Sequence, residues 1–399
     1  MSPFRTLRLL AFGLFSLFLF SQCSIHRAVS ASAEEAIVVQ KDSVFDHIYE
    51  RRLADADILR PKGFFTPEPT LDETLFSTVP VYYATDRQPT GKLDPYRFYS
   101  GKPDRAGLHF GKCMVTVPAI HELGELERPK WWTLEFSEDT RKHMVLKEVV
   151  IQSEADFFQE LHLAGLAADK REALVFIHGF NVSFDEAALR AAQITYDVSF
   201  GGVTLLYSWP SKGSPLKYGK DGKQNEATEP NLEYFLETLA REGGFDKIHI
   251  VAHSMGNRAL TASLIDLAQK SPDRPLFGQI ILAAPDVDSK TFVQDIAPLI
   301  HQTAQNVTLY ASSKDKALLL SEKIHKSPRA GEAGKNLVVV DHIETIDASD
   351  IDTDFLGHSY FANTWLLIND LHYLIDRGWV AEKRGLKETD REKQKYWAF

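Results

Sequence analysis

The chain has 399 residues, of which 44% are hydrophobic and 25% are charged. This composition is typical of a globular protein with a large core and excludes a fibrous or disordered chain. A formal net charge of −10, with the basic residues scattered, argues against a nucleic-acid-binding surface. The two cysteines, Cys23 and Cys113, have no metal-type spacing, which argues against a disulfide scaffold and a cysteine-ligated zinc site.

The first 33 residues have the features of a targeting segment. Two arginines precede an apolar run over residues 9–20, which is as long as the core of a signal peptide and short for a transmembrane helix. The sequence therefore predicts export to the periplasmic side of a bacterial cell envelope. Three outcomes stay open for this segment: lipidation at Cys23, cleavage after Ala33, or retention as a membrane anchor.

Four regions follow one another along the chain. Residues 1–33 are the signal peptide, lipoprotein signal or anchor. Residues 34–75 carry charges and prolines with little periodicity, which indicates an irregular tether and lead-in. We expect the folded domain over residues 76–378 and a charged C-terminal tail over residues 379–399.

The folded region opens with three β-rich runs and continues with alternating strands and helices. The opening runs are "VPVYYAT", "KCMVTVPA" and "MVLKEVVIQ". Continuous apolar strands that alternate with helices predict an α/β fold with a mainly parallel twisted sheet and helices on both faces. In such sheets, ligands bind at the carboxyl ends of the strands. The expected strands cover 173–180, 202–210, 247–254, 278–286, 306–315 and 336–346, and the expected helices cover 184–198, 231–241 and 257–270.

A serine occurs where one predicted strand meets the next helix, in "IHIVAHSMGNRAL". Residues Ala252 to Gly256 match the nucleophile-elbow pattern, small-x-Ser-x-small, in which a tight turn exposes the serine hydroxyl above the sheet. Ala252 takes the place of the commoner first glycine. The pattern predicts that Ser254 is a nucleophile; the structural alternative is a serine that caps the helix.

An earlier strand ends in "HGF", residues 178–180, and a capping box of Ser183 and Glu186 then starts a helix. In α/β-hydrolases the loop after this strand supplies one backbone N–H to the oxyanion hole, and the residue after the nucleophile supplies the other. These two donors would be Phe180 and Met255.

The acid and the base of a triad should follow Ser254 in that order. Asp315 ends a later strand, and His358 comes after the last predicted strand. We therefore expect His358 to act as general base and acid, with Asp315 orienting its imidazole. Asp286 and Asp288 remain alternative acids. Three other histidines are interpreted as packing residues: His249 and His342 inside strands, and His253 bracing the turn.

The chain resembles bacterial esterase- and lipase-like α/β-hydrolases of unknown function over roughly residues 75–375. The resemblance rests on "VPVYYATDR", "HFGKCMVTVPAIHELGELERP", "LVFIHGFNVSFDEAALRAAQ", "YSWPSKGS", "VAHSMGNRAL", "LAAPDVD", "LYASSKDKAL" and "GHSYF". It implies an α/β-hydrolase domain with ester-hydrolase activity and a triad of Ser254, Asp315 and His358. It does not imply a particular substrate.

The expected reaction cleaves a small acyl ester through an acyl-enzyme and needs neither a metal nor an organic cofactor. The segment over residues 211–230 is polar, which favours a soluble or polar-headed ester over a lipid. Trp209 and Tyr218 are candidates for lining the substrate pocket, although a buried tryptophan at a strand end is an equally good explanation for the former.

Two other classes of function stay open. One is a non-catalytic binding or scaffold protein of the cell envelope that uses a hydrolase fold. The other is an acyltransferase or peptidase of the S-x-x-K type, for which Ser313 and Lys316 have the spacing but not the strand-to-helix context. Beyond the substrate, the expected association is a membrane tether through the N-terminus, and nothing in the sequence defines an oligomeric state.

Overall fold

The structure is a computed structural model that describes residues 76–129, 135, 137–212, 218–271, 274–351, 361–391 and 393–399. The expected targeting segment with Cys23, the tether and His358 lie outside the described residues. Among the described helices, none has both the length and the apolar character needed to cross a membrane.

Eleven of the described strands form one sheet in the order β12-β13-β11-β10-β9-β8-β6-β7-β1-β4-β5. The middle of this sheet, from β1 across to β13, is parallel. The pairs β1–β4, β4–β5 and β12–β13 are antiparallel. The strands of the sheet are β1 (Phe76–Thr85), β4 (His109–Pro118), β5 (Val145–Gln152), β6 (Glu172–Ile177), β7 (Val203–Ser208), β8 (Lys247–His253), β9 (Phe277–Ala283), β10 (Ala304–Ala311), β11 (Glu344–Asp347), β12 (Lys387–Arg391) and β13 (Gln394–Ala398), and β2 (Arg87–Pro89) pairs separately with β3 (Tyr99–Pro103).

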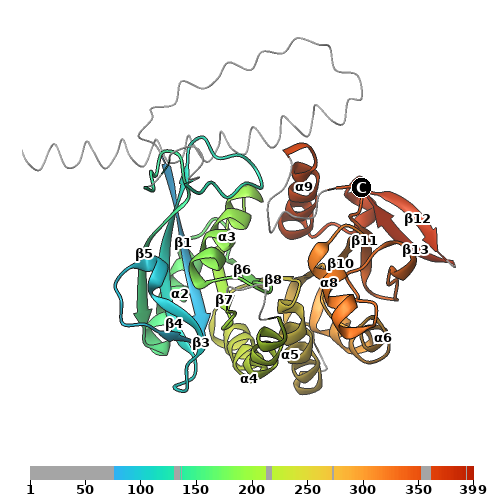
Figure 1. Cartoon of the computed structure of the whole chain (residues 1–399), viewed down its shortest axis with the longest axis horizontal. Coiled ribbons are helices and arrows are strands. Elements are labelled where there is room, and N and C mark those ends of the chain that lie inside the picture. The colour runs from blue at the N-terminus through green and yellow to red at the C-terminus, as the bar shows by residue number, and fades with distance from the viewer. Residues whose placement is uncertain are drawn as a thin grey trace, which may run out of the picture. The chain divides into compact units, whose positions relative to one another are not determined.

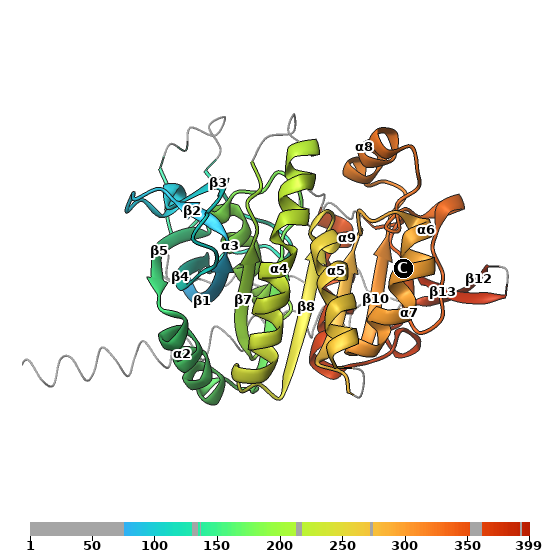
Figure 2. The same ribbon diagram turned by 90° about the horizontal axis from the view of Figure 1, so that it is seen from below.

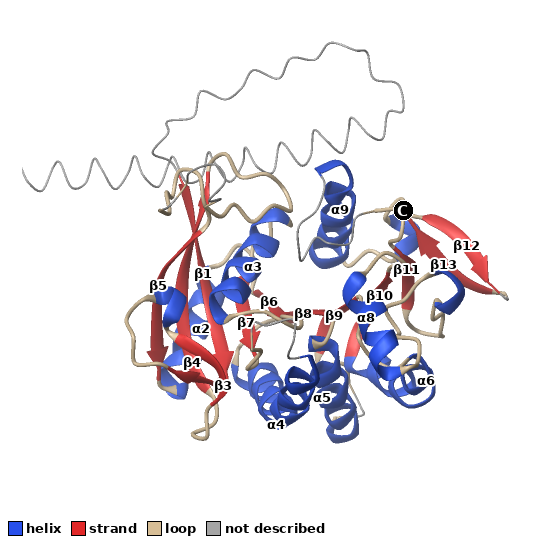
Figure 3. Cartoon of the chain, in the orientation of Figure 1, coloured by secondary structure: helices blue, strands red, loops and turns tan. Residues whose placement is uncertain are grey.

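Helices cover both faces of the parallel sheet (Figures 1 and 3). Helices α3 and α9 lie on one face and α4 and α5 on the other, and Figure 2 shows α4 and α5 in front of the strands. The main helices are α2 (Glu154–Ala167), α3 (Phe184–Asp197), α4 (Tyr218–Glu242), α5 (Gly256–Lys270), α8 (Lys316–His325) and α9 (Phe361–Arg377); α6 (Ser289–Thr291) and α7 (Ala297–Ile300) are short.

Alternate residues of each central strand pack into the two core layers. On β8, Ile250 and Ala252 join the layer under α4 and α5, whereas Val251 joins the layer under α3 and α9. Successive side chains of a strand point to opposite faces, so both faces of this strand are apolar. This arrangement confirms the predicted α/β fold with a mainly parallel sheet and helices on both faces.

The helix expected over 231–241 begins much earlier, at Tyr218, and continues through Pro230. Its first half is polar, which is why the sequence suggested a loop there. Some of these polar residues are nonetheless buried and hydrogen-bonded: Asp221 accepts hydrogen bonds from the Ser211 hydroxyl at 2.7 Å and the Lys212 N–H, and Asn225 accepts from Ala259 N–H. Satisfied hydrogen bonds allow polar side chains to be buried, and a hydrophobic pattern does not reveal them.

Two expectations near the C-terminus differ from the structure. The strand expected over 336–346 is restricted to β11, and His342 lies in a turn with φ +65°, where its exposed ring stacks on His301. The segment expected as a charged tail forms the hairpin β12–β13, which extends the sheet beside β11. Its charged residues hid the alternation, while Trp397 and Phe399 pack against the core layer under α3 and α9.

Candidate active site

Ser254 lies at the sharp turn between β8 and α5, at the carboxyl edge of the parallel sheet. Its φ of +48° is in the left-handed region, which is costly for a residue with a side chain. Ser254 N–H donates to Ala283 O at 2.9 Å, and Ser254 O accepts from the N–H groups of Asn257 and Asp286 at 3.1 and 3.2 Å. The backbone of this strained residue is therefore held by the turns on either side of it.

The hydroxyl of Ser254 does not cap α5. The N-cap of this helix is Met255, which makes no side-chain capping bond. Within the described residues, no hydrogen bond involves the Ser254 hydroxyl, although its side chain is 4% exposed. The alternative explanation of a capping serine does not fit this geometry.

Two glycines let the β6 and β8 turns approach each other closely. A Cβ on Gly256 would lie 2.5 Å from His178 O, so only glycine fits there. A Cβ on Gly179 would lie 2.9 Å from His253 Nδ1 and 3.1 Å from Ser254 Cβ. The loop after β6 therefore runs directly past the Ser254 side chain.

The two backbone groups expected to form an oxyanion hole have no acceptor among the described residues. Neither Phe180 N–H nor Met255 N–H donates a hydrogen bond there. Met255 is fully buried, and the Phe180 ring packs edge-on against Tyr218 with centroids 5.2 Å apart. Buried N–H groups are almost always paired, so the buried Met255 N–H, which has no acceptor among the described residues, is available to an external oxygen.

Trp209 lies against the loop after β6. Its side chain is fully buried, and its ring stacks on the His178 imidazole at 5.0 Å with an interplanar angle of 17°. Its Nε1–H donates to His178 O at 2.7 Å. The ring is therefore enclosed and braces the backbone of "HGF", and the expectation that Trp209 lines a substrate pocket stays a prediction.

Asp286, one of the alternative acids, is enclosed in a hydrogen-bonded cluster. Its carboxylate accepts from Arg258 Nη2 and Arg329 Nε, each at 2.9 Å, and from the hydroxyls of Tyr218 and Ser321. Both oxygens are therefore occupied. Tyr218, the second expected pocket residue, belongs to the same cluster, and burial together with the Asp286 charge raises the pKa of its phenol.

The other expected acids cap helices. Asp288 accepts from Thr291 N–H at 3.0 Å at the start of α6, and this backbone hydrogen bond lowers the pKa of its carboxyl. Asp315 accepts from Leu318 N–H at 2.9 Å at the start of α8, and its side chain is half-buried. Asp315 follows β10, two strands from β8 in the sheet, at the edge where Figure 2 shows α8. His358 is not described.

Several neighbours of Ser254 were not singled out from the sequence. Asn257 Nδ2 lies within 3.1 to 3.3 Å of the carbonyls of Ala252, Ser254 and Ala283, so it ties the elbow to β9. Three arginines hold the turns around it: Arg258 and Arg329 bind Asp286, and Arg87 contacts His178. A polar residue directly after "HSMG" is the only local signal for Asn257, and nothing local marks Arg329, because its partner is 43 positions away.

Two of the three histidines interpreted as packing residues are enclosed, whereas the third, His342, is exposed. Burial, with the Arg190 charge, lowers the pKa of His253 to about 3, so this imidazole is neutral. His249 is buried at the other end of β8, with Nε2 3.4 Å from Glu172. Within the described residues, no group of three or more His, Cys, Asp or Glu side chains could hold a metal ion.

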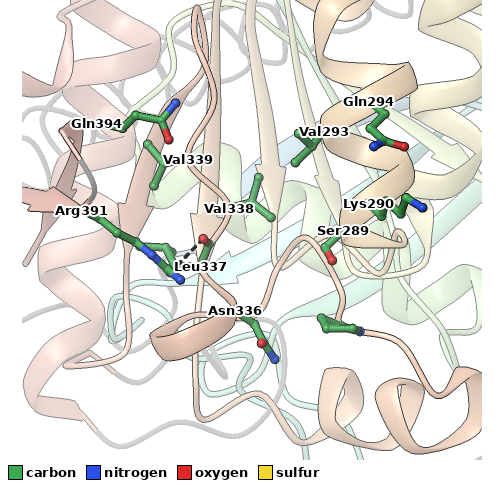
Figure 4. Close-up of a pocket in the computed structure, with 11 residues that line it drawn as sticks. Ser289, Lys290, Val293, Gln294, Asn336, Leu337, Val338, Val339, Arg391 and Gln394 are labelled. Carbon is green, nitrogen blue, oxygen red and sulfur yellow. Dashed lines mark hydrogen bonds between the residues drawn. The ribbon is translucent and has the colours of Figure 1, made fainter.

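Two cavities are informative. The larger, of about 360 Å³, is an open groove between Lys290, Val293 and the segment 336–339 (Figure 4). None of the expected site residues lines it, so size alone does not identify the site. The smaller, of about 40 Å³, lies at the ends of β8 to β10 beside the elbow. Its described lining includes His253, Ala283, Ala284, Tyr310, Leu367 and Leu371.

Two solved structures are similar to the chain: a mutant of esterase rPPE, at 13% identity and a TM-score of 0.25, and an acylaminoacyl peptidase of Pyrococcus horikoshii, at 12% identity and a TM-score of 0.28. The alignments cover 70% and 75% of this chain and 65% and 58% of those chains, so the chain spans less than two thirds of each. No curated protein matches. A family model described as "Alpha/beta hydrolase of unknown function (DUF900)" matches residues 154–376, more than half of the chain, and the chain belongs to this family.

Proposed function

We propose that the protein is a serine hydrolase that cleaves a carboxylic ester through an acyl-enzyme on Ser254. One observation carries the proposal: a strained serine lies beside two N–H groups, and neither its hydroxyl nor these N–H groups have a hydrogen-bond partner among the described residues. Strained backbone persists where the surrounding structure enforces it and is concentrated at functional sites. Ser254 does not cap α5, so helix capping does not explain the serine at this turn.

In the proposed mechanism His358 takes the proton of Ser254 as the hydroxyl attacks the ester carbonyl. The N–H groups of Phe180 and Met255 stabilise the negative charge that develops on the carbonyl oxygen. His358 then protonates the departing alcohol, and water releases the acid from Ser254 with His358 again as base. No cofactor takes part in this scheme.

Asp315 is the acid that we propose to orient His358. It follows β10, and two strand spacings amount to about 10 Å, a gap that a bridging imidazole with its two hydrogen bonds can span. Asp286 is a poorer candidate because two arginines and two hydroxyls already occupy its oxygens. A carboxylate saturated in this way has no lone pair directed at an additional imidazole.

We propose that the small cavity beside the elbow receives the acyl group. Its described lining is mainly apolar, and Leu367 and Leu371 of α9 form one wall. A water-sized group needs roughly 10 to 15 Å³ of such volume, so this cavity holds about three or four carbon atoms. Short acyl chains are therefore the proposed substrate class. We also propose that the N-terminal segment exports the protein to the cell envelope.

Hydrolysis of p-nitrophenyl butyrate by the full chain tests the nucleophile. Ser254→Ala should lower kcat/KM by about 10⁴-fold or more. Ser263→Ala, on α5 but turned to Glu229 O, is the matched control and should be unchanged. An active Ser254→Ala variant would reject the proposed nucleophile.

The same assay separates the two candidate acids. Asp315→Asn should lower kcat by about 10⁴-fold, because asparagine cannot hold an imidazolium as a carboxylate does. Asparagine still caps a helix, so α8 should be preserved. If Asp315→Asn stays active while a folded Asp286→Asn variant is inactive, the acid is Asp286.

A further inference from the structure

Arg87 is a buried cation whose hydrogen bonds all go to neutral groups within the described residues. It is 1% exposed, at the start of β2. Nε donates to Ser208 Oγ at 2.8 Å, Nη1 to Ser211 O at 3.2 Å, and Nη2 to Val182 O at 2.8 Å. Buried charges are usually paired with an opposite charge, so the position of this guanidinium calls for a reason.

The fourth contact of Arg87 is with the histidine of "HGF". Nη2 lies 3.1 Å from His178 Nε2, and Ser208 Oγ lies 3.2 Å from the same nitrogen. A guanidinium has only donors, so Nε2 must be the acceptor and the ring proton must be on Nδ1. Trp209 O is also 3.2 Å from Nε2 and would favour the opposite tautomer, but arginine offers no acceptor that would permit it.

The proton on His178 Nδ1 has a defined target. Nδ1 lies 2.8 Å from Gly179 O and donates to it. Burial, reinforced by the Arg87 charge, lowers the pKa of His178 well below its usual value, so the ring remains neutral and keeps one donor and one acceptor. Stacking on Trp209 fixes the plane of the ring.

This hydrogen bond controls the direction of the proposed oxyanion donor. The carbonyl of Gly179 and the N–H of Phe180 belong to one planar trans peptide, so they point in opposite directions. Holding the carbonyl toward His178 turns the Phe180 N–H away from that ring. Gly179 itself lies against Ser254, where a Cβ would be 3.1 Å from Ser254 Cβ.

We propose that Arg87 and His178 are positioning residues that fix the Gly179–Phe180 peptide and so aim the Phe180 N–H at the substrate oxygen. The relay runs from Arg87 Nη2 through His178 to Gly179 O. This inference rests on the proposed function, since it assigns a task within that site.

Kinetics with p-nitrophenyl butyrate test the relay through kcat and KM separately. His178→Phe keeps the stacked ring but removes both hydrogen bonds, and kcat should fall by about 100-fold with KM nearly unchanged. In His178→Asn the amide nitrogen replaces Nδ1, so kcat should be about tenfold higher than in His178→Phe. His249→Phe, at an equally buried histidine of β8, is the control and should keep its kcat. Equal losses in both His178 variants would overturn the relay.

A second measurement does not depend on the folding of the His178 variants. Nitrogen NMR of the full chain labelled with ¹⁵N-histidine should show one neutral imidazole protonated at Nδ1 whose signal changes in Ser208→Ala. If that residue carries its proton on Nε2 in an active enzyme, the relay is overturned and the proposed function stands. A natural protein that cleaves no ester and is not acylated at Ser254 would overturn the proposed function and the relay together.

Discussion

The turns after β8 and β9 lie side by side at one edge of the sheet, but the polar groups at the two turns differ in how many hydrogen bonds they make. At the first, the Ser254 hydroxyl and the Met255 N–H have no partner among the described residues. At the second, every oxygen of the Asp286 carboxylate is bonded, and its backbone carbonyl accepts from both arginines as well. Saturated groups hold a structure, whereas unsaturated ones are available to a ligand.

The two turns are also linked. Asp286 N–H donates to Ser254 O, and Ser254 N–H donates to Ala283 O, so the saturated turn supports the strained one. The difference teaches that an acidic residue near a nucleophile need not be catalytic. The hydrogen-bond partners of such a carboxylate show whether it can orient a histidine or serves to hold the surrounding structure together.

The largest effect that we expect on stability comes from Asp286→Ala. Removing the carboxylate leaves Arg258 and Arg329 buried without their counter-ion, which should lower the free energy of unfolding by about 4 kcal/mol. Urea unfolding measures this loss, with the exposed Asp295→Ala as control. A change below about 1 kcal/mol would show that the cluster is not a structural support.

A second saturated cluster extends the comparison to pH. His121 lies between Glu127 at 2.9 Å and Asp197 at 2.7 Å. Burial by itself would lower the pKa of His121, but the two carboxylates raise it to about 10. Between these two pKa values the folded state holds a proton that the unfolded state has released. The contribution of this cluster to stability is therefore fully present below pH 6.5 and is lost as the pH rises toward 10.

We therefore expect unfolding experiments to show a loss of stability across that window that is missing in His121→Gln. His162→Gln, at an exposed histidine, should keep the slope of the natural protein. If the slope of His121→Gln equals that of the natural protein, the imidazole is not held as a cation.

Gly179→Ala should disturb the turn after β8, which carries Ser254, and leave intact the turn after β9, which carries Asp286. The added methyl group would press on His253 and Ser254 and displace the loop that carries the Phe180 N–H. Loss of one oxyanion donor costs about 100-fold or more in kcat. Gly219→Ala is the matched control, because a Cβ there meets no atom within 4 Å. Full activity of Gly179→Ala would place the oxyanion site elsewhere.

The smallest effect concerns chain length. Leu371→Ala should enlarge the small cavity and raise the ratio of hexanoyl to butyryl ester hydrolysis by about tenfold, which is typical of fitting one or two more methylenes. Leu374→Ala removes an equally buried leucine of α9 that does not line the cavity, so the ratio should stay constant. An unchanged ratio in Leu371→Ala would exclude this cavity as the acyl site.

The features that the sequence predicted are those encoded locally. An apolar strand, a small-residue turn and a helix around Ser254 are adjacent in the chain, and the capping box of Ser183 and Glu186 spans only three positions. Local geometry of this kind follows from steric and capping preferences. The α/β fold itself followed from the alternation of strands and helices.

The features that were missed depend on distant partners. Arg329 meets Asp286 across 43 positions, and Arg87 meets His178 across 91, so neither pairing is visible in a window of sequence. The early start of α4 was hidden because its buried residues are polar and become satisfied only by tertiary hydrogen bonds. The contact of Trp209 with His178 was not visible either, because the two residues are 31 positions apart.

Labelling of the full chain by a fluorophosphonate probe, with the modified residue located by mass spectrometry, tests the central claim most directly. The uncommitted hydroxyl of Ser254 should be phosphonylated, and Ser254→Ala, folded as judged by circular dichroism, should remain unlabelled. Modification of another serine, equal labelling of the two proteins, or no labelling of the natural protein would contradict the claim that this turn carries a reactive nucleophile.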